Sequence, residues 1–330
     1  MFRVLGAGAL TVAGLALAGC DGVQSSLAPQ GPSARSIANL SWVMFAGASA
    51  VLALVMVLAL YAVFRTPARH RGIPDTLMVA VGGFAWPVLT LSALLVYGVY
   101  QMGDLRAGPE PALEIQVTGH QWWWEVRYPG AGGQPEVVTA NQIHIPAGVP
   151  VSIALRSADV IHSFWVPNLS GKMDLIPGRT NRLRLQADAP GRFRGQCAEF
   201  CGAQHARMAL LVVAEPPDRF AAWLDAQRRP ATAPAGQSAQ RGYAAFAQHC
   251  SACHSVRGLV ERRGPDVGPD LTHLGSRAFI AAGTLENTPD NLRRFIAAND
   301  RIKPGNRMPV FDGLDPATLA ALGDFLGGLH

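Results

Sequence analysis

Charged residues are scarce in this sequence, and their scarcity limits the kind of protein it can be. Of its 330 residues, 15% are Asp, Glu, Lys or Arg and 49% are hydrophobic, whereas soluble domains carry about 25% charged residues. We therefore expect part of the chain to lie in a membrane. The net charge of +5 comes from Arg and Lys residues that are scattered rather than clustered, which argues against nucleic-acid binding. The length allows two or three domains.

Cysteine is also scarce, since the chain has five, and the first of them lies in a targeting signal. A charged start is followed by an apolar run that ends in the letters LAGC at residues 17–20, the pattern of a secretory signal. This ending resembles the lipobox of bacterial lipoproteins. The resemblance implies a lipoprotein signal peptide over 1–19 and a lipidated N-terminal segment over 20–40, with the lipid on Cys20. A plain signal peptide with a chance cysteine is the alternative.

Two stretches contain no charged residue at all, 41–64 and 76–100. Each is long enough to cross a bilayer, which takes about 20 apolar residues, so the sequence predicts a transmembrane hairpin over 41–103. The connector carries three arginines between residues 65 and 71, and the positive-inside bias places it in the cytoplasm. We therefore expect the later domains to lie in the periplasm, anchored to a bacterial inner membrane.

After the hairpin, the pattern changes to short runs in which apolar and polar residues alternate, as at Leu113, Ile115 and Val117. Such alternation, interrupted by Gly and Pro, is typical of antiparallel strands. We predict an all-β sandwich or barrel over 112–226, closed by a short helix.

The rest of the chain is predicted to be a linker and a helical domain. Residues 227–240 are rich in Pro, Ala and Gly, as expected between domains. Residues 241–330 have helical patterns, with Thr288 and Asp315 each preceding a proline at an expected helix start. A domain of about 90 residues has a small core, and such domains are often stabilised by a cofactor.

The two C-terminal cysteines stand in the pattern Cys250-Ser-Ala-Cys253-His254, the attachment signature of a c-type haem. The two thiols bond the haem covalently, and His254 becomes its first axial ligand. Met308 is the only methionine after Met208 and is the expected sixth ligand. A redox dithiol would need a βαβ context, and a zinc site would need a second Cys pair, so both are less favoured. The block resembles a class I cytochrome c.

Cys197 and Cys201 remain, and residues alone leave four interpretations for them: a disulfide, a zinc site, a helix face or a soft-metal site. His205 and Met208 follow closely, and His162 lies on an earlier strand end. Zinc has no use for a thioether. Thiolate, imidazole and thioether on a β-sandwich are the donors of a cupredoxin copper site, because soft sulfur ligands favour Cu(I).

The segments HSFWVP, KMDLIPGR, GQCAEFCGAQHARM and GHQWWWEVRYP resemble cytochrome c oxidase subunit II, and the fused cytochrome resembles its caa-type branch. The resemblance implies a cupredoxin-like sandwich with a dinuclear copper A centre. It further implies that the Glu199 carboxylate reaches a magnesium ion at the border with subunit I, and that Trp122 is the aromatic through which electrons enter. Trp123 and Trp124 are expected at an interface. The implied copper ligands are His162, Cys197, Cys201, His205, Met208 and the Glu199 carbonyl.

The resemblance therefore implies a multidomain membrane protein that consists of a two-helix transmembrane hairpin, an all-β cupredoxin-like sandwich and an all-α cytochrome c domain. Its implied function is to accept electrons from cytochrome c through haem c and copper A. These electrons pass to the haem of subunit I, where oxygen is reduced to water and protons are pumped. Subunits I and III are the implied partners. A copper A subunit of a nitric oxide reductase and a non-enzymatic electron-shuttle lipoprotein are the alternatives. One departure is Ala80, which stands where many members have a glutamate in a proton-uptake path.

Overall fold

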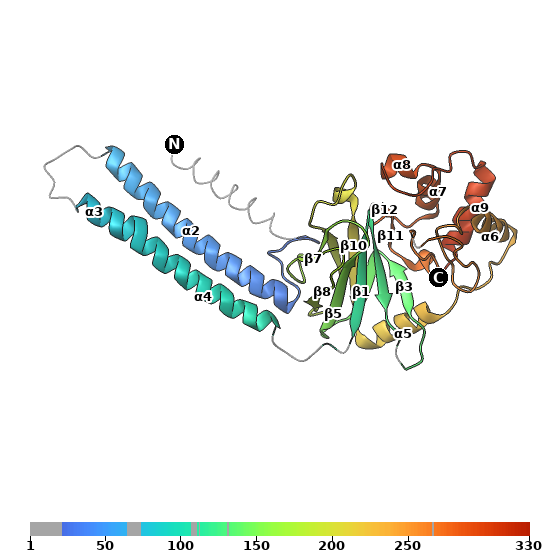
Figure 1. Cartoon of the computed structure of the whole chain (residues 1–330), viewed down its shortest axis with the longest axis horizontal. Coiled ribbons are helices and arrows are strands. Elements are labelled where there is room, and N and C mark those ends of the chain that lie inside the picture. The colour runs from blue at the N-terminus through green and yellow to red at the C-terminus, as the bar shows by residue number, and fades with distance from the viewer. Residues whose placement is uncertain (1–21, 65–73, 107–110, 112, 131, 266) are drawn as a thin grey trace, which may run out of the picture. The chain divides into compact units, whose positions relative to one another are not determined.

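A computed structural model describes residues 22–64, 74–106, 111, 113–130, 132–265 and 267–330 (Figure 1). Cys20 and the predicted signal peptide lie outside these residues. The chain forms two compact units. One is Arg35–Glu110, and the other is Pro111–His330 with the chain up to Ala34.

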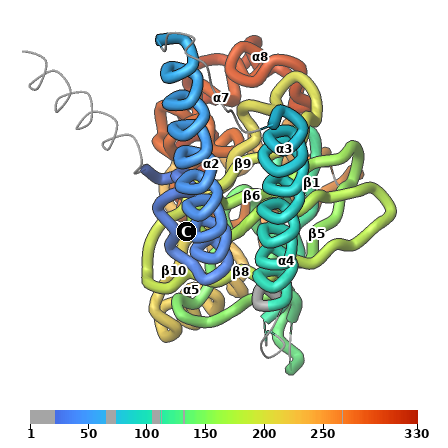
Figure 2. The backbone as a smooth tube through the Cα atoms, turned by 90° about the vertical axis from the view of Figure 1, so that its left-hand side faces the viewer, coloured from blue at the N-terminus to red at the C-terminus, as the bar shows by residue number. Residues whose placement is uncertain are grey.

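The smaller unit contains two helical stretches that run alongside each other in opposite directions (Figure 1, Figure 2). The first is α2, and the second is continuous through α3, a π-helical segment η1, and α4. Both stretches are long and apolar enough to cross a membrane, which supports membrane anchoring. Pro87 has no N–H to offer the preceding turn, and η1 ends just before it. The bounds are α2 Pro32–Phe64, α3 Asp75–Met78, η1 Val79–Ala85 and α4 Trp86–Arg106.

The larger unit begins with a sandwich of two five-stranded sheets, with strand orders β3-β2-β1-β5-β8 and β4-β10-β9-β6-β7. The alternation predicted for the first strand is present, because Ile115 and Val117 are fully buried. The bounds are β1 Glu114–His120, β2 Trp123–Tyr128, β3 Val137–Ala140, β4 Gln142–Pro146, β5 Val151–Ser157, β6 His162–Trp165, β7 Met173–Leu175, β8 Asn181–Leu185, β9 Gly191–Cys197 and β10 Ala209–Glu215.

The prediction of antiparallel strands is correct for most pairs but wrong for two. β1 pairs with β5, and β4 with β10, in parallel. Parallel neighbours need a crossover connection. Between β1 and β5 the chain passes through the opposite sheet as β4, and this passage supplies the crossover. Tyr128 joins the two sheets, because its hydroxyl accepts from the His144 N–H at 2.7 Å and donates to the His144 carbonyl at 2.9 Å.

Helix α5, Pro217–Arg228, follows the sandwich, and the helical domain follows that. Its helices are α6 Gln237–His249, α7 Pro289–Ala297, α8 Asn299–Ile302 and α9 Pro316–Gly327, with a small β11–β12 hairpin of Phe279–Ile280 and Leu285–Glu286. The predicted helix starts are present, since the side chains of Thr288 and Asp315 accept backbone N–H groups of the first turns of α7 and α9. The expected fold class is confirmed.

Helices α6 and α9 cross so closely that only glycine fits at one position. A Cβ added at Gly242 would lie 1.9 Å from the carbonyl oxygen of Ala321. This contact closes a second hydrophobic core, separate from that of the sandwich, around Phe246, Leu322 and Phe325.

Candidate functional site

The loop between β9 and β10 brings four of the predicted copper ligands together. Cys197 ends β9, and its N–H donates to the Met208 carbonyl at 2.9 Å, which folds the intervening segment back on itself. Cys201 lies at the turn of this loop, and His205 opens a short 3₁₀ helix. His162 begins β6, which pairs with the end of β9. Strand pairing thus delivers a histidine from 35 positions away.

The sulfur and nitrogen atoms of these residues form one compact group. The Cys197 and Cys201 sulfurs are 3.8 Å apart, whereas a disulfide bond is about 2.05 Å long, so the two are free thiols. Cys197 Sγ lies 3.9 Å from His162 Nδ1, and Cys201 Sγ lies 3.8 Å from His205 Nδ1. Each thiol therefore faces one imidazole.

The two remaining donors complete the set. Met208 Sδ lies 3.8 Å from Cys201 Sγ, and the Glu199 carbonyl lies 3.2 Å from Cys197 Sγ. All six predicted donor residues thus belong to one connected cluster around the two cysteines, in which the ligand atoms of His162, Cys197 and Cys201 lie within 4.8 Å of one another. The helix-face interpretation is wrong, because Cys197 belongs to a strand. A buried thioether beside the two thiols suits copper better than zinc.

The electrostatics of the pair favour one thiolate. The hydrogen bond with Cys201 lowers the pKa of Cys197, and the same contact raises the pKa of Cys201. Burial lowers the pKa of His162, but hydrogen bonds with Asp159 and Cys197 outweigh burial, so the pKa is raised overall. The contact therefore favours the thiolate form at Cys197, which is a soft donor for a metal.

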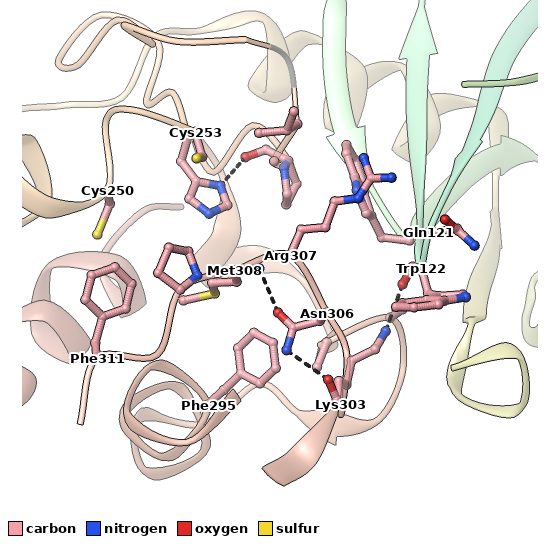
Figure 3. A pocket seen from close by; sticks show the side chains of 18 of the residues that line it. Gln121, Trp122, Cys250, Cys253, Phe295, Lys303, Asn306, Arg307, Met308 and Phe311 are labelled. Atoms are coloured by element: carbon pink, nitrogen blue, oxygen red, sulfur yellow. Dashed lines mark hydrogen bonds between the residues drawn. The ribbon is translucent and has the colours of Figure 1, made fainter. Parts of the chain in front are cut away.

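The predicted haem residues line a cavity of about 220 Å³, whose wall also includes residues of the sandwich (Figure 3). Cys250 and Cys253 are free thiols at its edge. His254 Nδ1 bonds to the Pro269 carbonyl at 2.8 Å, which leaves Nε2 for a metal. Met308 lines the same cavity. The four predicted haem residues thus line one cavity.

Trp122 lies between the copper loop and the haem cavity. Its Nε1 donates to the Cys201 carbonyl at 2.9 Å. A Cβ added at Gly202, in the copper loop, would be 3.0 Å from its ring, and one added at Gly305, beside Met308, would be 3.8 Å away. Trp122 also lines the haem cavity. A single indole is therefore flanked by the segments that carry both predicted sites.

Comparison with known proteins gives the family. Residues 131–215 match the family described as cytochrome C oxidase subunit II, periplasmic domain, and residues 239–330 match cytochrome c. The chain is 34% identical over 336 residues to cytochrome c oxidase subunit 2 of Alkalihalophilus pseudofirmus, covering 96% of this chain and 94% of that protein. The chain belongs to the cytochrome c oxidase subunit II family.

Other relatives match shorter parts of this subunit II. Cytochrome c oxidase subunit 2 of Bacillus subtilis is 31% identical over 229 residues, covering 67% of this chain and 63% of that protein. Among solved structures, the periplasmic domain of subunit II of the Bradyrhizobium japonicum oxidase is 32% identical, with a TM-score of 0.34, and covers 36% of this chain and 96% of that one. The fused cytochrome c domain corresponds to the caa-type branch, and the chain is a subunit of a haem-copper oxidoreductase.

The residues present fit both cofactors that the family implies. The copper donor set contains two thiols, two imidazoles, a thioether and a carbonyl. Neither thiol is in a disulfide, so both can bind a metal. The haem cavity adjoins Arg277, whose Nε has no hydrogen-bond partner among the described residues. Burial lowers the pKa of Arg277 to about 10, so it is a cation at neutral pH. It suits a haem carboxylate.

Subunit II also uses residues that the sequence did not point to. Asp159 Oδ1 accepts from His162 Nε2 at 2.8 Å, so it orients a predicted copper ligand. It stands three positions before His162, and this spacing was the only available signal. Lys303, in the haem domain, donates to the Trp122 carbonyl at 2.8 Å, and no local pattern reveals that contact.

One expectation about the tryptophans is wrong. Trp124 is fully buried in the sandwich core and meets Phe164 edge to face, with ring centroids 6.0 Å apart. It cannot pack at an interface with another subunit, because β2 turns its side chain inward. Trp123 stacks on His120 and lines the haem cavity.

Proposed function

We propose that this subunit conducts electrons from cytochrome c, by way of a haem c and a dinuclear copper A centre, to the haem of subunit I, where oxygen is reduced to water and protons are pumped. Each of the two cofactors, when bound, takes up and releases one electron at a time. The proposed haem residues are Cys250, Cys253, His254 and Met308, and the proposed copper ligands are His162, Cys197, Glu199, Cys201, His205 and Met208.

The placement of Trp122 carries this proposal. Its indole hydrogen-bonds to the carbonyl of Cys201 and forms part of the wall of the haem cavity. Gln121 Nε2 donates to the same carbonyl at 2.8 Å, which holds the turn against the copper loop. We propose Trp122 as the residue through which electrons enter the copper site. In this chain it faces the chain's own haem domain.

The protein's own contribution is rigidity and dryness. Cys197, Cys201 and Met208 are at most 4% exposed, and His162 is fully buried. Donors held by strand ends inside a packed core change position little when the charge of a bound metal changes. A small rearrangement favours fast electron transfer.

The surface above the copper site suits subunit I. Glu199 and Phe200 lie between the two buried cysteines and are exposed, Phe200 by 76%. A large exposed aromatic is typical of an interface. We propose that subunit I covers this surface and that the Glu199 carboxylate binds magnesium there, since carboxylate oxygens suit hard cations. Subunit III completes the proposed complex.

The remaining proposals concern location and domain limits. We propose an inner-membrane protein with two transmembrane helices, a lipid on Cys20, and both cofactor domains in the periplasm. The proposed divisions are a signal peptide over 1–19, a lipidated segment over 20–40, a hairpin over 41–103, the copper domain over 112–226, a linker over 227–240 and the cytochrome over 241–330.

Spectra of the purified full-length oxidase test the assignment. We expect a haem c absorbance band together with a mixed-valence two-copper EPR signal. A haem band without that EPR signal would contradict the copper assignment. Trp122→Phe keeps an aromatic ring but removes the hydrogen bond to Cys201, so we expect both spectra to persist while electron transfer from haem c to copper slows. An unchanged transfer rate would contradict the role of Trp122.

A further inference from the structure

The chain contains two lysines, Lys172 and Lys303, and one of them is buried where the two cofactor domains meet. Lys303 follows α8 in the haem domain and is 4% exposed. Its Nζ donates to the Trp122 carbonyl at 2.8 Å (Figure 3) and to the Arg207 carbonyl at 3.2 Å. Both carbonyls belong to the copper domain. One side chain thus connects the haem domain to the β1–β2 turn and to the copper loop.

The connection continues from Lys303 to the predicted axial methionine. Asn306 Nδ2 donates to the Lys303 carbonyl at 2.8 Å, and the Met308 N–H donates to Asn306 Oδ1 at 2.9 Å. Asn299, which is fully buried, donates to the Pro309 carbonyl at 2.8 Å. An unbroken chain of hydrogen bonds therefore runs from the backbone of Met308 through Lys303 to Trp122, and from Trp122 to the copper loop.

The buried Lys303 amine has its two carbonyl partners only while the haem domain is docked on the copper domain. An amine removed from water is unfavourable unless its N–H groups are bonded, and both of the partners given above are carbonyls of the other domain. Burial lowers the pKa of Lys303 to about 7. Both the charged and the neutral amine have at least two N–H donors, so either form satisfies both carbonyls.

Other contacts hold the same arrangement. The Ala209 N–H donates to the Ala282 carbonyl, and the Ala278 N–H to Gln142 Oε1, each at 3.0 Å. The start of the linker is also held, because His273 bonds to the Gln227 carbonyl at 3.1 Å. The linker is therefore not a free tether at this end.

We propose that Lys303 is a positioning residue that locks the Met308 segment of the haem domain onto Trp122 of the copper domain. The docked arrangement is then the stable state of subunit II, and the cytochrome domain stays bound to the copper domain between turnovers. This inference rests on the proposed function for its consequence for electron transfer, but not for the lock itself.

Lys303→Leu and Arg301→Leu in the purified full-length oxidase form a matched pair. Arg301 is an exposed basic residue two positions earlier, on α8, so the two variants replace neighbouring basic side chains with the same residue. Leucine is preferred to methionine, because a new thioether beside the haem cavity could replace Met308. Hydrogen exchange is measured at the amides of Ala209 and Ala278, which undocking would expose.

We expect Lys303→Leu to speed exchange at these two amides by roughly tenfold or more, since two buried carbonyls lose their donors. The haem and copper spectra should persist, and electron transfer between the domains should slow. Arg301→Leu should match the wild type. Unchanged exchange in Lys303→Leu would overturn the proposal.

A second measurement needs no variant. Lysines of the wild-type oxidase are acylated at neutral pH and quantified by mass spectrometry against the unfolded chain. Lys172 is exposed and serves as the internal reference, so slower acylation of Lys303 than of Lys172 reports the burial of Lys303 between the domains. Rapid acylation would overturn the lock even if Lys303→Leu failed to fold. Absence of the copper signal would instead overturn the proposed function, because neither the labelling nor the exchange depends on that signal.

Discussion

Asp159→Asn tests whether the carboxylate behind His162 determines how strongly the site holds copper. Oδ1 of Asp159 accepts from His162 Nε2 and from the Val160 N–H, each at 2.8 Å, and Oδ2 accepts from the Gln121 N–H at 2.7 Å. An amide places its NH₂ group at one of these two positions, where it meets an N–H. Whichever way the amide turns, at least one contact is lost.

The charge of Asp159 makes the expected loss of copper affinity larger. Burial raises the pKa of Asp159, but the bonds from His162 and from the Gln121 and Val160 N–H groups outweigh burial, so the pKa is lowered overall. The carboxylate is therefore ionised at neutral pH and makes His162 a better donor. Loss of such a partner of a metal-bound histidine lowers metal affinity by about 10–100-fold, equivalent to about 1.4–2.7 kcal/mol.

The assay is a competition for copper between the oxidase and a chelator of known affinity, followed by the EPR signal. Asp218→Asn is the matched control, because Asp218 is an exposed carboxylate on α5. We expect the control to bind as the wild type does. If Asp159→Asn held copper as tightly as the control, the assigned role of Asp159 would be refuted.

Two further predictions concern stability. Gly242→Ala would put a Cβ 1.9 Å from the Ala321 carbonyl oxygen. Overpacking costs roughly 1–3 kcal/mol, more than the roughly 1 kcal/mol that alanine gains over glycine in a helix. The midpoint of urea unfolding, followed by haem absorbance, should therefore fall. An unchanged midpoint would refute the close crossing of α6 and α9. Burial lowers the pKa of His144, although Glu215 opposes the shift, so the folded state binds a proton less readily than the unfolded chain. The neutral His144 therefore contributes fully to stability above about pH 6.5, and this contribution is lost as the pH falls below that value. The drop in melting temperature on acidification should be smaller in His144→Gln than in the wild type. An equal drop would exclude His144 as the cause.

The proposed haem residues could be identified as candidates from the sequence because their chemistry is local. Covalent attachment needs two thiols a fixed distance apart and an imidazole beside them, and Cys250, Cys253 and His254 meet that need within five positions. The proposed copper ligands could be identified only in part from local sequence. Cys197, Cys201 and His205 share one loop, whereas His162 joins them only through the pairing of β6 with β9.

Trp124 shows where local pattern is insufficient. Three successive tryptophans give no sign of which one faces solvent, a partner or the core. The register of β1 with β2 pairs Trp124 with Gly119. In this register the Trp124 side chain is buried in the sandwich. Trp122 remains in the turn and stays between the two sites.

The sequence by itself determined the family, the types of domain and the candidate residues for haem and copper, because coordination chemistry requires particular side chains at particular spacings. Only the tertiary structure revealed the partners of those residues, such as Asp159 behind His162. It also revealed Lys303, whose bond to Trp122 spans 181 positions. Contacts at such separations depend on how strands and domains pack, and no spacing along the chain encodes them.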